Sequence, residues 1–178
     1  MKPTVLSALL LAALATPAAA EEIRARLGGY QEVPSVSTPA GGEFKAHISR
    51  DDGLIEYELS YSDLIGTVQQ SHIHFGQRSV NGSIVIWLCQ TPTTQAPLDV
   101  RGLTPQCPQS GTVTGQITKA NVINASTTSQ QITAGELEEV LAAIRAGVAY
   151  VNVHTTPLNA GGEIRGQIRA SRREGGKD

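Results

Sequence analysis

Methionine, cysteine and aromatic residues are scarce in this chain of 178 residues. Met1 is the only methionine, and Cys89 and Cys107 are the only cysteines. If the two cysteines are bonded to each other, no ligand set of the Cys-His-His-Met kind remains for a blue-copper centre. The sequence also lacks a Gly-x-Ser-x-Gly elbow and a glycine-rich phosphate loop. These absences argue against blue-copper electron transfer, serine hydrolysis and nucleotide binding.

Long apolar runs are also missing, apart from one at the N-terminus. Val5–Ala15 is interrupted only by Ser7 and is shorter than the roughly 20 apolar residues of a transmembrane helix. Lys2 precedes this run and three alanines end at Ala20, which is the pattern of a cleavable secretory signal peptide. We expect residues 1–20 to be removed on export to the periplasm or the medium. The product should not insert into a membrane.

Neither sign of charge is in large excess. The chain has 14 basic and 16 acidic residues, and without Lys2 it keeps 13 basic residues and a formal charge of −3. Nucleic acids and anionic membranes select strongly basic partners. We therefore expect no nucleic-acid partner. The expected partner is a protein or a small ligand, which the sequence does not identify. The glycine-rich end, residues 169–178, predicts a flexible C-terminal tail.

The two cysteines fit an exported protein, because disulfides persist in oxidising compartments. A bond between Cys89 and Cys107 would tie the ends of a proline-rich loop and stabilise the fold by about 3 kcal/mol in the chain-entropy model. A pair of metal thiolates is the alternative. Neither a CxxC spacing nor a neighbouring histidine supports that alternative.

Period-two alternation dominates residues 21–168 and predicts a single all-β domain. The apolar side chains of 44–48 and of 55–61 each share one face, and Asp51-Asp52-Gly53 between them is a hairpin turn signal. Residues 84–88 are apolar on both faces and indicate a central strand. We expect an antiparallel β-sandwich with Greek-key connections.

One short connecting helix is expected near residues 134–146. Thr133 and Glu136 have the spacing of a capping box, and Gly147 stands where a helix commonly ends. The apolar face of this helix comprises Leu137, Val140, Leu141 and Ile144.

Three of the four histidines lie in two strand-like segments, 71–76 and 150–155. His72 and His74 are two residues apart, so on a strand their side chains point to the same side. The same alternation places His154 on the polar side of its own segment. If the two strands are neighbours, the three imidazoles converge on a site suited to copper or zinc.

A purely structural role is the alternative for these histidines. Their imidazoles would then hydrogen-bond to the backbone or to Asn152 and form a polar seam, with no cofactor. The fourth histidine, His47, alternates outward and should be exposed. Glu163 and Arg165 share one strand face, where we expect a surface ion-pair ladder, although Arg165 close to the histidines could bind an anion.

Several short motifs occur in order between Ile23 and Ile168. They are Gln31–Pro34, Ser71–Gly76, Asn81-Gly82 before an apolar strand, a helix into Ala146-Gly147, Tyr150–Thr155 and Gly162–Gln167. Together they resemble the CHRD domain, a family named after chordin that includes many exported bacterial proteins. The resemblance implies no accepted catalytic residues. It does place His72, His74 and His154 inside motifs of the family.

The segment His72–Gly76 is also similar to the copper-ligand strand of Cu,Zn superoxide dismutases, which are Greek-key sandwiches. We accordingly expect an immunoglobulin-like or dismutase-like sandwich. The sequence contains no second histidine cluster with an aspartate to build the bridged zinc site of those enzymes. The function that the sequence favours is a non-catalytic binding or structural module of the cell envelope, and a copper- or zinc-dependent enzyme is the alternative.

Overall fold

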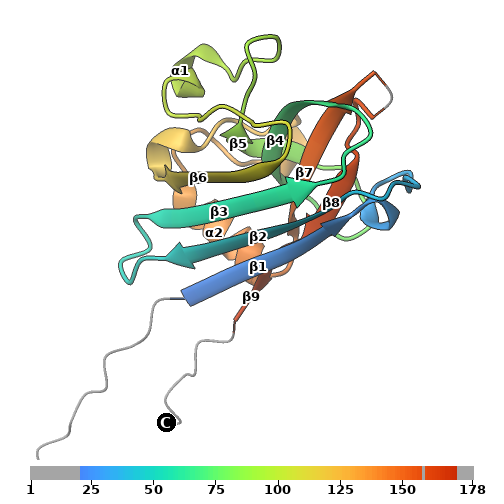
Figure 1. Ribbon diagram of the computed structural model, residues 1–178. Helices are drawn as coiled ribbons and strands as arrows, with labels where there is room; N and C mark the ends of the chain where they lie inside the picture. Colours follow the sequence, from blue (N-terminus) through green and yellow to red (C-terminus); the bar gives the residue numbers. More distant parts are fainter. Residues whose placement is uncertain (1–20, 158, 172–178) are drawn as a thin grey trace, which may run out of the picture.

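The fold is one continuous antiparallel sheet in a computed structural model that describes residues 21–157 and 159–171 (Figure 1). Its strands are β1 (Glu21–Gly28), β2 (Gly41–Ile48), β3 (Ile55–Ser62), β4 (Thr67–Phe75), β5 (Ser83–Cys89), β6 (Gly111–Ile117), β7 (Ala149–Thr156), β8 (Ile164–Gln167) and β9 (Arg169–Ala170). The strand order is β5-β4-β7-β8-β1-β2-β3-β6, and β9 pairs with β1. The predicted signal peptide, residues 1–20, lies outside the described residues.

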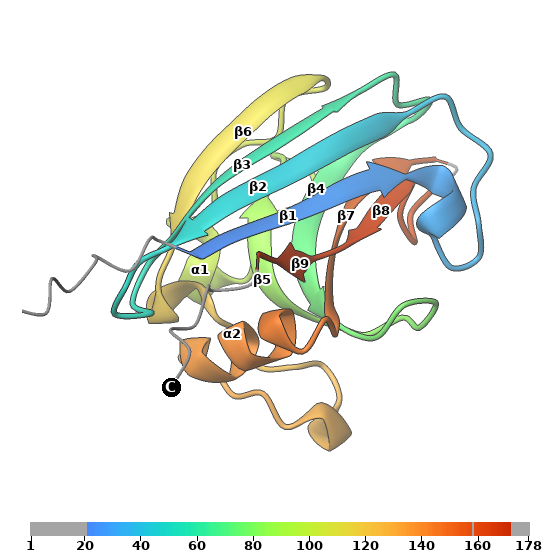
Figure 2. The ribbon, with the colours of Figure 1, turned by 90° about the horizontal axis from the view of Figure 1, so that it is seen from below.

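The sheet curls until its two end strands approach each other, so it forms a nearly closed barrel (Figure 2). The all-β antiparallel class is therefore confirmed, whereas two separate sandwich sheets are not observed. The strand β5 was predicted to be central and instead lies at one end of the strand order. It is apolar on both faces because the segment after β6 covers its free edge, where Ile123 N donates to Val85 O at 3.0 Å.

Alternating side chains of β1, β2 and β3 fill the barrel, as the period-two pattern predicted. Phe44 and Leu59 face each other across β2 and β3, and both are fully buried. The predicted turn joins these strands, with Asp52 at a φ of 56°. Outward-facing His47 is exposed, as expected.

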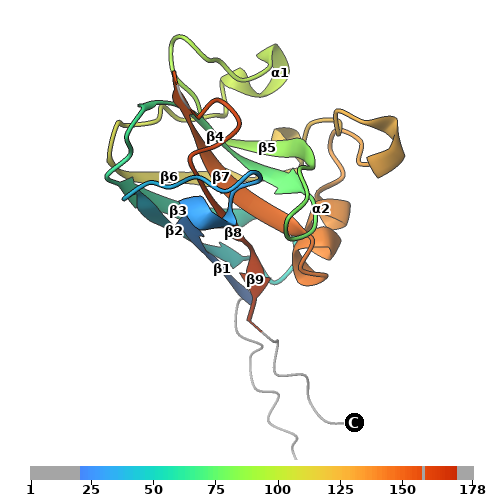
Figure 3. The same ribbon diagram turned by 90° about the vertical axis from the view of Figure 1, so that its right-hand side faces the viewer.

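The predicted helix is shorter than expected. The α-helix α2 spans Leu137–Arg145 and begins three residues late, because Gly135 has a φ of +89°, outside the helical region. Only half of the capping box forms, since Glu136 Oε2 accepts from Thr133 N at 2.7 Å. The apolar face of α2 joins the core, and the helix lies beside β7 and β9 (Figure 3).

Four further helical turns connect the strands. They are the 3-10 helices η1 (Gly29–Gln31), η2 (Lys119–Asn121) and η3 (Thr128–Gln130) and the four-residue helix α1 (Leu98–Arg101). No helix among the described residues is long and apolar enough to cross a membrane. The predicted flexible tail, residues 169–178, is wrong at its start. There β9 pairs with β1, and Ser171 N donates to Glu22 O. Residues 172–178 lie outside the described part of the chain.

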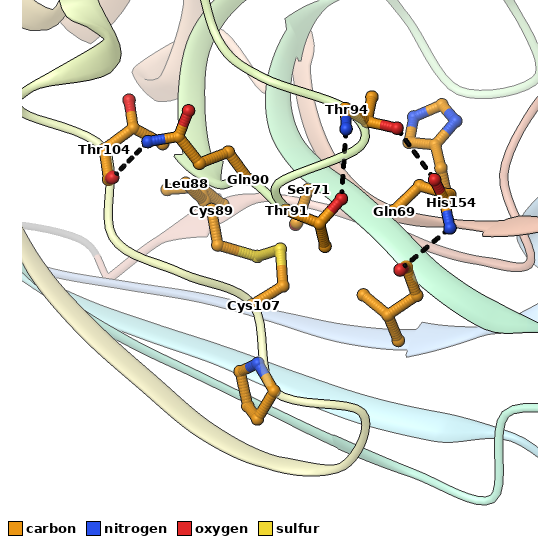
Figure 4. Close-up of a disulfide and its surroundings, with 12 residues drawn as sticks. Gln69, Ser71, Leu88, Cys89, Gln90, Thr91, Thr94, Thr104, Cys107 and His154 are labelled. Atoms are coloured by element: carbon orange, nitrogen blue, oxygen red, sulfur yellow. Dashed lines mark hydrogen bonds between the residues drawn. A yellow bond between two sulfur atoms is a disulfide. The ribbon is translucent and has the colours of Figure 1, made fainter.

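A disulfide joins Cys89 at the end of β5 to Cys107 (Figure 4). The loop between them is anchored at both ends. Gln90 Nε2 donates to Thr104 O at 2.7 Å, and Thr94 Oγ1 donates to Gln69 Oε1 of β4 at 2.7 Å. The covalent bond and these hydrogen bonds hold the loop against the β4–β5 end of the sheet.

Reduction of this disulfide should lower the free energy of unfolding by about 3 kcal/mol, because the two cysteines are 18 positions apart in the sequence and the reduced unfolded chain gains loop entropy. Urea unfolding with and without reductant measures the difference, which should appear as a lower midpoint after reduction. Equal midpoints, or free thiols in freshly isolated protein, would contradict the prediction.

Candidate metal centre

The strands β4 and β7 are antiparallel neighbours, which brings the three histidines onto one face of the sheet. His72 pairs with Asn152 and His74 pairs with Tyr150 across the two strands. His154 is two residues beyond Asn152 and shares its side of β7. The predicted convergence of the histidines is therefore confirmed. Ile73 and Val151 point to the opposite side and are fully buried in the core.

Nitrogen atoms of the three imidazoles lie close together. One ring nitrogen from each residue lies within 4.8 Å of the others. The shortest separation is 3.2 Å, between His72 Nδ1 and His154 Nε2. Two nitrogens bound to one zinc ion at about 2.1 Å in a tetrahedral arrangement are about 3.4 Å apart. The closest pair is thus already at the spacing of two ligands of one metal ion.

Backbone carbonyls determine which nitrogens can bind a metal. His74 Nδ1 lies 2.9 Å from Gly82 O, and His154 Nδ1 lies 2.8 Å from Ala160 O. A carbonyl oxygen only accepts hydrogen bonds, so Nδ1 of His74 carries the proton and its Nε2 keeps its lone pair. Both nitrogens of His154 face oxygen atoms, because its Nε2 lies 3.0 Å from Asn152 Oδ1. The Nε2 atom of His74 is buried and has no hydrogen-bond partner within the described residues. It is a metal-ligand atom without an alternative partner.

Burial keeps the three imidazoles neutral. His72 is fully buried, and His74 and His154 are 6% and 7% exposed. Burial lowers the pKa of His74 to about 4 and holds the pKa of His72 well below its usual value, where the neighbouring histidines lower it further. Burial also lowers the pKa of His154. Neutral imidazole is the form that binds metal, so the site needs no deprotonation at neutral pH.

Aromatic and cationic groups surround the cluster. The Trp87 ring of β5 lies edge-on to His72, with 4.3 Å between ring centroids. On the other side, the Tyr150 ring stacks on His74 at 4.6 Å and 4°, and the Arg165 guanidinium carbon lies 3.3 Å from the Tyr150 ring centroid. The stack of Arg165, Tyr150 and His74 holds the His74 ring in one orientation.

The predicted surface ladder of Glu163 and Arg165 is wrong, because both side chains are buried and they do not pair with each other. Arg165 donates to Gln77 O, Val80 O and Asn81 Oδ1, which are in the loop after β4. Loops cover the sheet face that alternation alone had assigned to solvent. Arg165 therefore anchors a covering loop.

Two further residues belong to the site: Asn152, which the sequence offered as a hydrogen-bond partner of the imidazoles, and Glu32, which carried no clear signal in the sequence. Asn152 Oδ1 lies 3.0 Å from His154 Nε2 and is a potential fourth ligand. Glu32, in the loop after η1, is 5% exposed, and burial raises the pKa of its carboxyl group to about 7 despite the opposing charge of Arg165. An acidic residue in a Gln-Glu-Val-Pro turn normally indicates solvent exposure, so only its place in the ordered motifs could have singled it out.

Comparison with known proteins gives one match. The family model described as the CHRD domain matches residues 23–168, which include all three histidines and both cysteines. No curated protein and no solved structure matches the chain. The chain therefore belongs to the CHRD domain family, as the order of its motifs predicted.

Proposed function

We propose that this protein is an exported, non-catalytic binding module of the cell envelope that holds one copper or zinc ion between His72, His74 and His154. The observation that carries the proposal is the convergence of three buried, neutral imidazoles whose nitrogens lie within 4.8 Å of one another. Zinc and copper(II) both accept neutral imidazole. The disulfide between Cys89 and Cys107 supports the exported location.

The donor set fits such an ion. The lone pair of His74 Nε2 is available because a backbone carbonyl holds the opposite nitrogen, and His154 Nε2 faces the other two donor groups of the cluster. His72 Nδ1 faces His154 Nε2 at 3.2 Å, and Asn152 Oδ1 lies 3.0 Å from the same nitrogen. Three nitrogens and one amide oxygen would complete the four-coordinate arrangement typical of zinc.

The closed surroundings of the site favour a protein that holds the metal ion over an enzyme that uses the ion in catalysis. Structural metal sites are closed, whereas catalytic sites keep a position open to water or substrate. All three histidines are at most 7% exposed, and Asn152 is 2% exposed. A copper- or zinc-dependent enzyme, the competing hypothesis, would need an opening of the covering loops to admit a substrate.

Titration of the metal-free protein with copper(II) tests this function. Trp87 is the only tryptophan and lies beside His72, so a paramagnetic ion in the cluster should quench its fluorescence. We expect quenching to saturate at one equivalent and elemental analysis to find one ion per chain. A His72→Ala, His74→Ala double variant should lose both signals, whereas His47→Ala, which changes an exposed histidine on β2, should keep them. Equal quenching in the double variant would refute the site.

A further inference from the structure

A second site of different chemistry lies on the outer face of β1, away from the histidine cluster. It is a groove of about 630 Å³. Its charged residues are Glu22, Arg24, Arg26, Glu43, Arg78 and Arg169. Four arginines and two glutamates give this groove a net positive charge, although the chain as a whole is negative.

The four arginines differ in the counter-charges beside them. Arg24 pairs with Glu22 at 2.6 Å and Arg26 lies directly opposite Glu43 on β2, whereas Arg78 and Arg169 form no ion pair within the described residues. All four arginine side chains belong to exposed residues. Guanidinium groups gathered in one concave surface are suited to bidentate binding of carboxylate or other oxyanions.

The strand register adds an energetic argument. Arg24 of β1 lies directly opposite Arg169 of β9 on one side and directly opposite Lys45 of β2 on the other. Like charges directly opposite each other on neighbouring strands destabilise a sheet. Two of the three cations are balanced by neighbours, because Arg24 pairs with Glu22 and Lys45 pairs with Glu43 at 2.8 Å. Arg169 is the cation of this row that an anionic ligand would neutralise.

The neutral and acidic groups of the groove restrict the ligand further. Glu22 and Glu43 would repel a continuous row of phosphates, but they can accept hydrogen bonds from hydroxyl groups. Gln31, Gln167 and Ser171 complete the polar lining. This combination of cations and hydroxyl-binding groups fits a molecule that carries both carboxylates and hydroxyls.

A smaller hollow of about 290 Å³ adjoins the groove and extends it. The two share Gln31, Arg78 and Gln167 as lining residues. Tyr30 of η1 lines the smaller hollow and is 79% exposed, so its ring offers a free apolar face on which a sugar ring can pack. The two hollows together form an elongated surface with cations at one end and an aromatic ring at the other.

We propose that this surface binds an acidic oligosaccharide, with carboxylates on Arg24, Arg26 and Arg169 and a sugar ring on Tyr30. The ligand is a chain of carboxylated sugars. Binding requires no metal.

Isothermal titration of the full mature protein with tetragalacturonate tests the proposal. We expect the Arg26→Gln, Arg169→Gln double variant to bind at least about tenfold more weakly, since each lost charge-assisted contact contributes more than 1 kcal/mol. The matched control is Arg50→Gln, an exposed arginine in the turn between β2 and β3 that does not line the groove. Its affinity should change less than twofold.

Tyr30→Ala should weaken binding of tetragalacturonate severalfold without changing the weak binding of free acetate, which contacts no ring. Maltotetraose, an uncharged oligosaccharide, should not bind. The double variant should unfold at about the same temperature as wild type, because it removes one cross-strand attraction, Arg26 with Glu43, and one cross-strand repulsion, Arg169 with Arg24. Equal affinities of the double variant and the Arg50→Gln control would overturn the proposal. So would tighter binding to single-stranded DNA or to phosphatidylglycerol vesicles than to tetragalacturonate.

Discussion

His154→Ala should weaken copper(II) binding at least tenfold. His154 would contribute the central ligand atom, because its Nε2 lies 3.2 Å from His72 Nδ1 and 3.0 Å from Asn152 Oδ1. Loss of outer partners of metal ligands typically costs roughly 10- to 100-fold in affinity, and loss of a direct ligand should cost no less. Competition with a chelator of known affinity gives the dissociation constants of wild type and variant.

The matched control for this variant is His47→Ala, which removes an exposed imidazole from β2 and should leave the affinity unchanged. Thermal unfolding of both variants in the absence of metal separates a lost ligand from a lost fold. The hypothesis of one shared site fails if folded His154→Ala protein binds copper(II) as tightly as wild type.

Glu163→Gln should lower the free energy of unfolding by about 2–4 kcal/mol, because hydrogen bonds to charged groups contribute roughly 1.5–3 kcal/mol each and the amide cannot replace all of them. Glu163 is fully buried. Its carboxylate accepts four hydrogen bonds, from Thr38 Oγ1, Ile65 N, Gly66 N and Thr155 Oγ1. A glutamine directs N–H groups at some of these donors. Urea unfolding at pH 7 measures the loss.

The same contacts make stability depend on pH. Burial alone would raise the pKa of Glu163, but the hydrogen bonds from Thr155, Ile65, Thr38 and Gly66 together lower it below the ordinary value of 4.5. A depressed folded pKa gives stability that is present above pH 4.5 and is lost as the pH falls through the folded value. Wild type should therefore lose more stability than Glu163→Gln on acidification below pH 4.5.

Glu32 provides an internal comparison with the opposite sign. Its folded pKa is raised to about 7, so the folded state binds the proton more tightly and stability falls as the pH rises from 4.5 to 7. A Glu32→Gln variant should lack that dependence, whereas its behaviour below pH 4.5 should match wild type. Parallel curves for wild type and Glu163→Gln below pH 4.5 would show that Glu163 does not titrate as described.

Alternation along the strands made much of the fold predictable. Strands such as Phe44–Ile48 place apolar residues inward at every second position, and a turn signal separates them from the next strand. The closure of one sheet into a barrel depends on pairings between distant strands, such as β1 with β8 and β4 with β7, and no local pattern encodes them. The position of β5 in the strand order was predicted wrongly, because an edge strand covered by another segment of the chain is as apolar as a central strand.

The histidine cluster was predictable because two-residue spacing determines the side on which each imidazole lies. The burial of the cluster was not predictable, because the loops that cover it are distant from the histidines in the sequence. Arg165 and Glu163 illustrate the limit: alternation assigned both to an exposed face, yet both are buried, Arg165 beneath the loop after β4 and Glu163 against Thr38 and Thr155. Sequence patterns indicate which residues share a face and do not indicate what covers it.

The most direct test of the metal centre is a crystal of the protein soaked in copper(II), with diffraction data collected on both sides of the copper absorption edge. The account predicts one anomalous peak enclosed by His72, His74 and His154, about 2.0–2.2 Å from a nitrogen of each. A crystal whose only copper peak lies at exposed His47, with none among the three buried imidazoles, would contradict it.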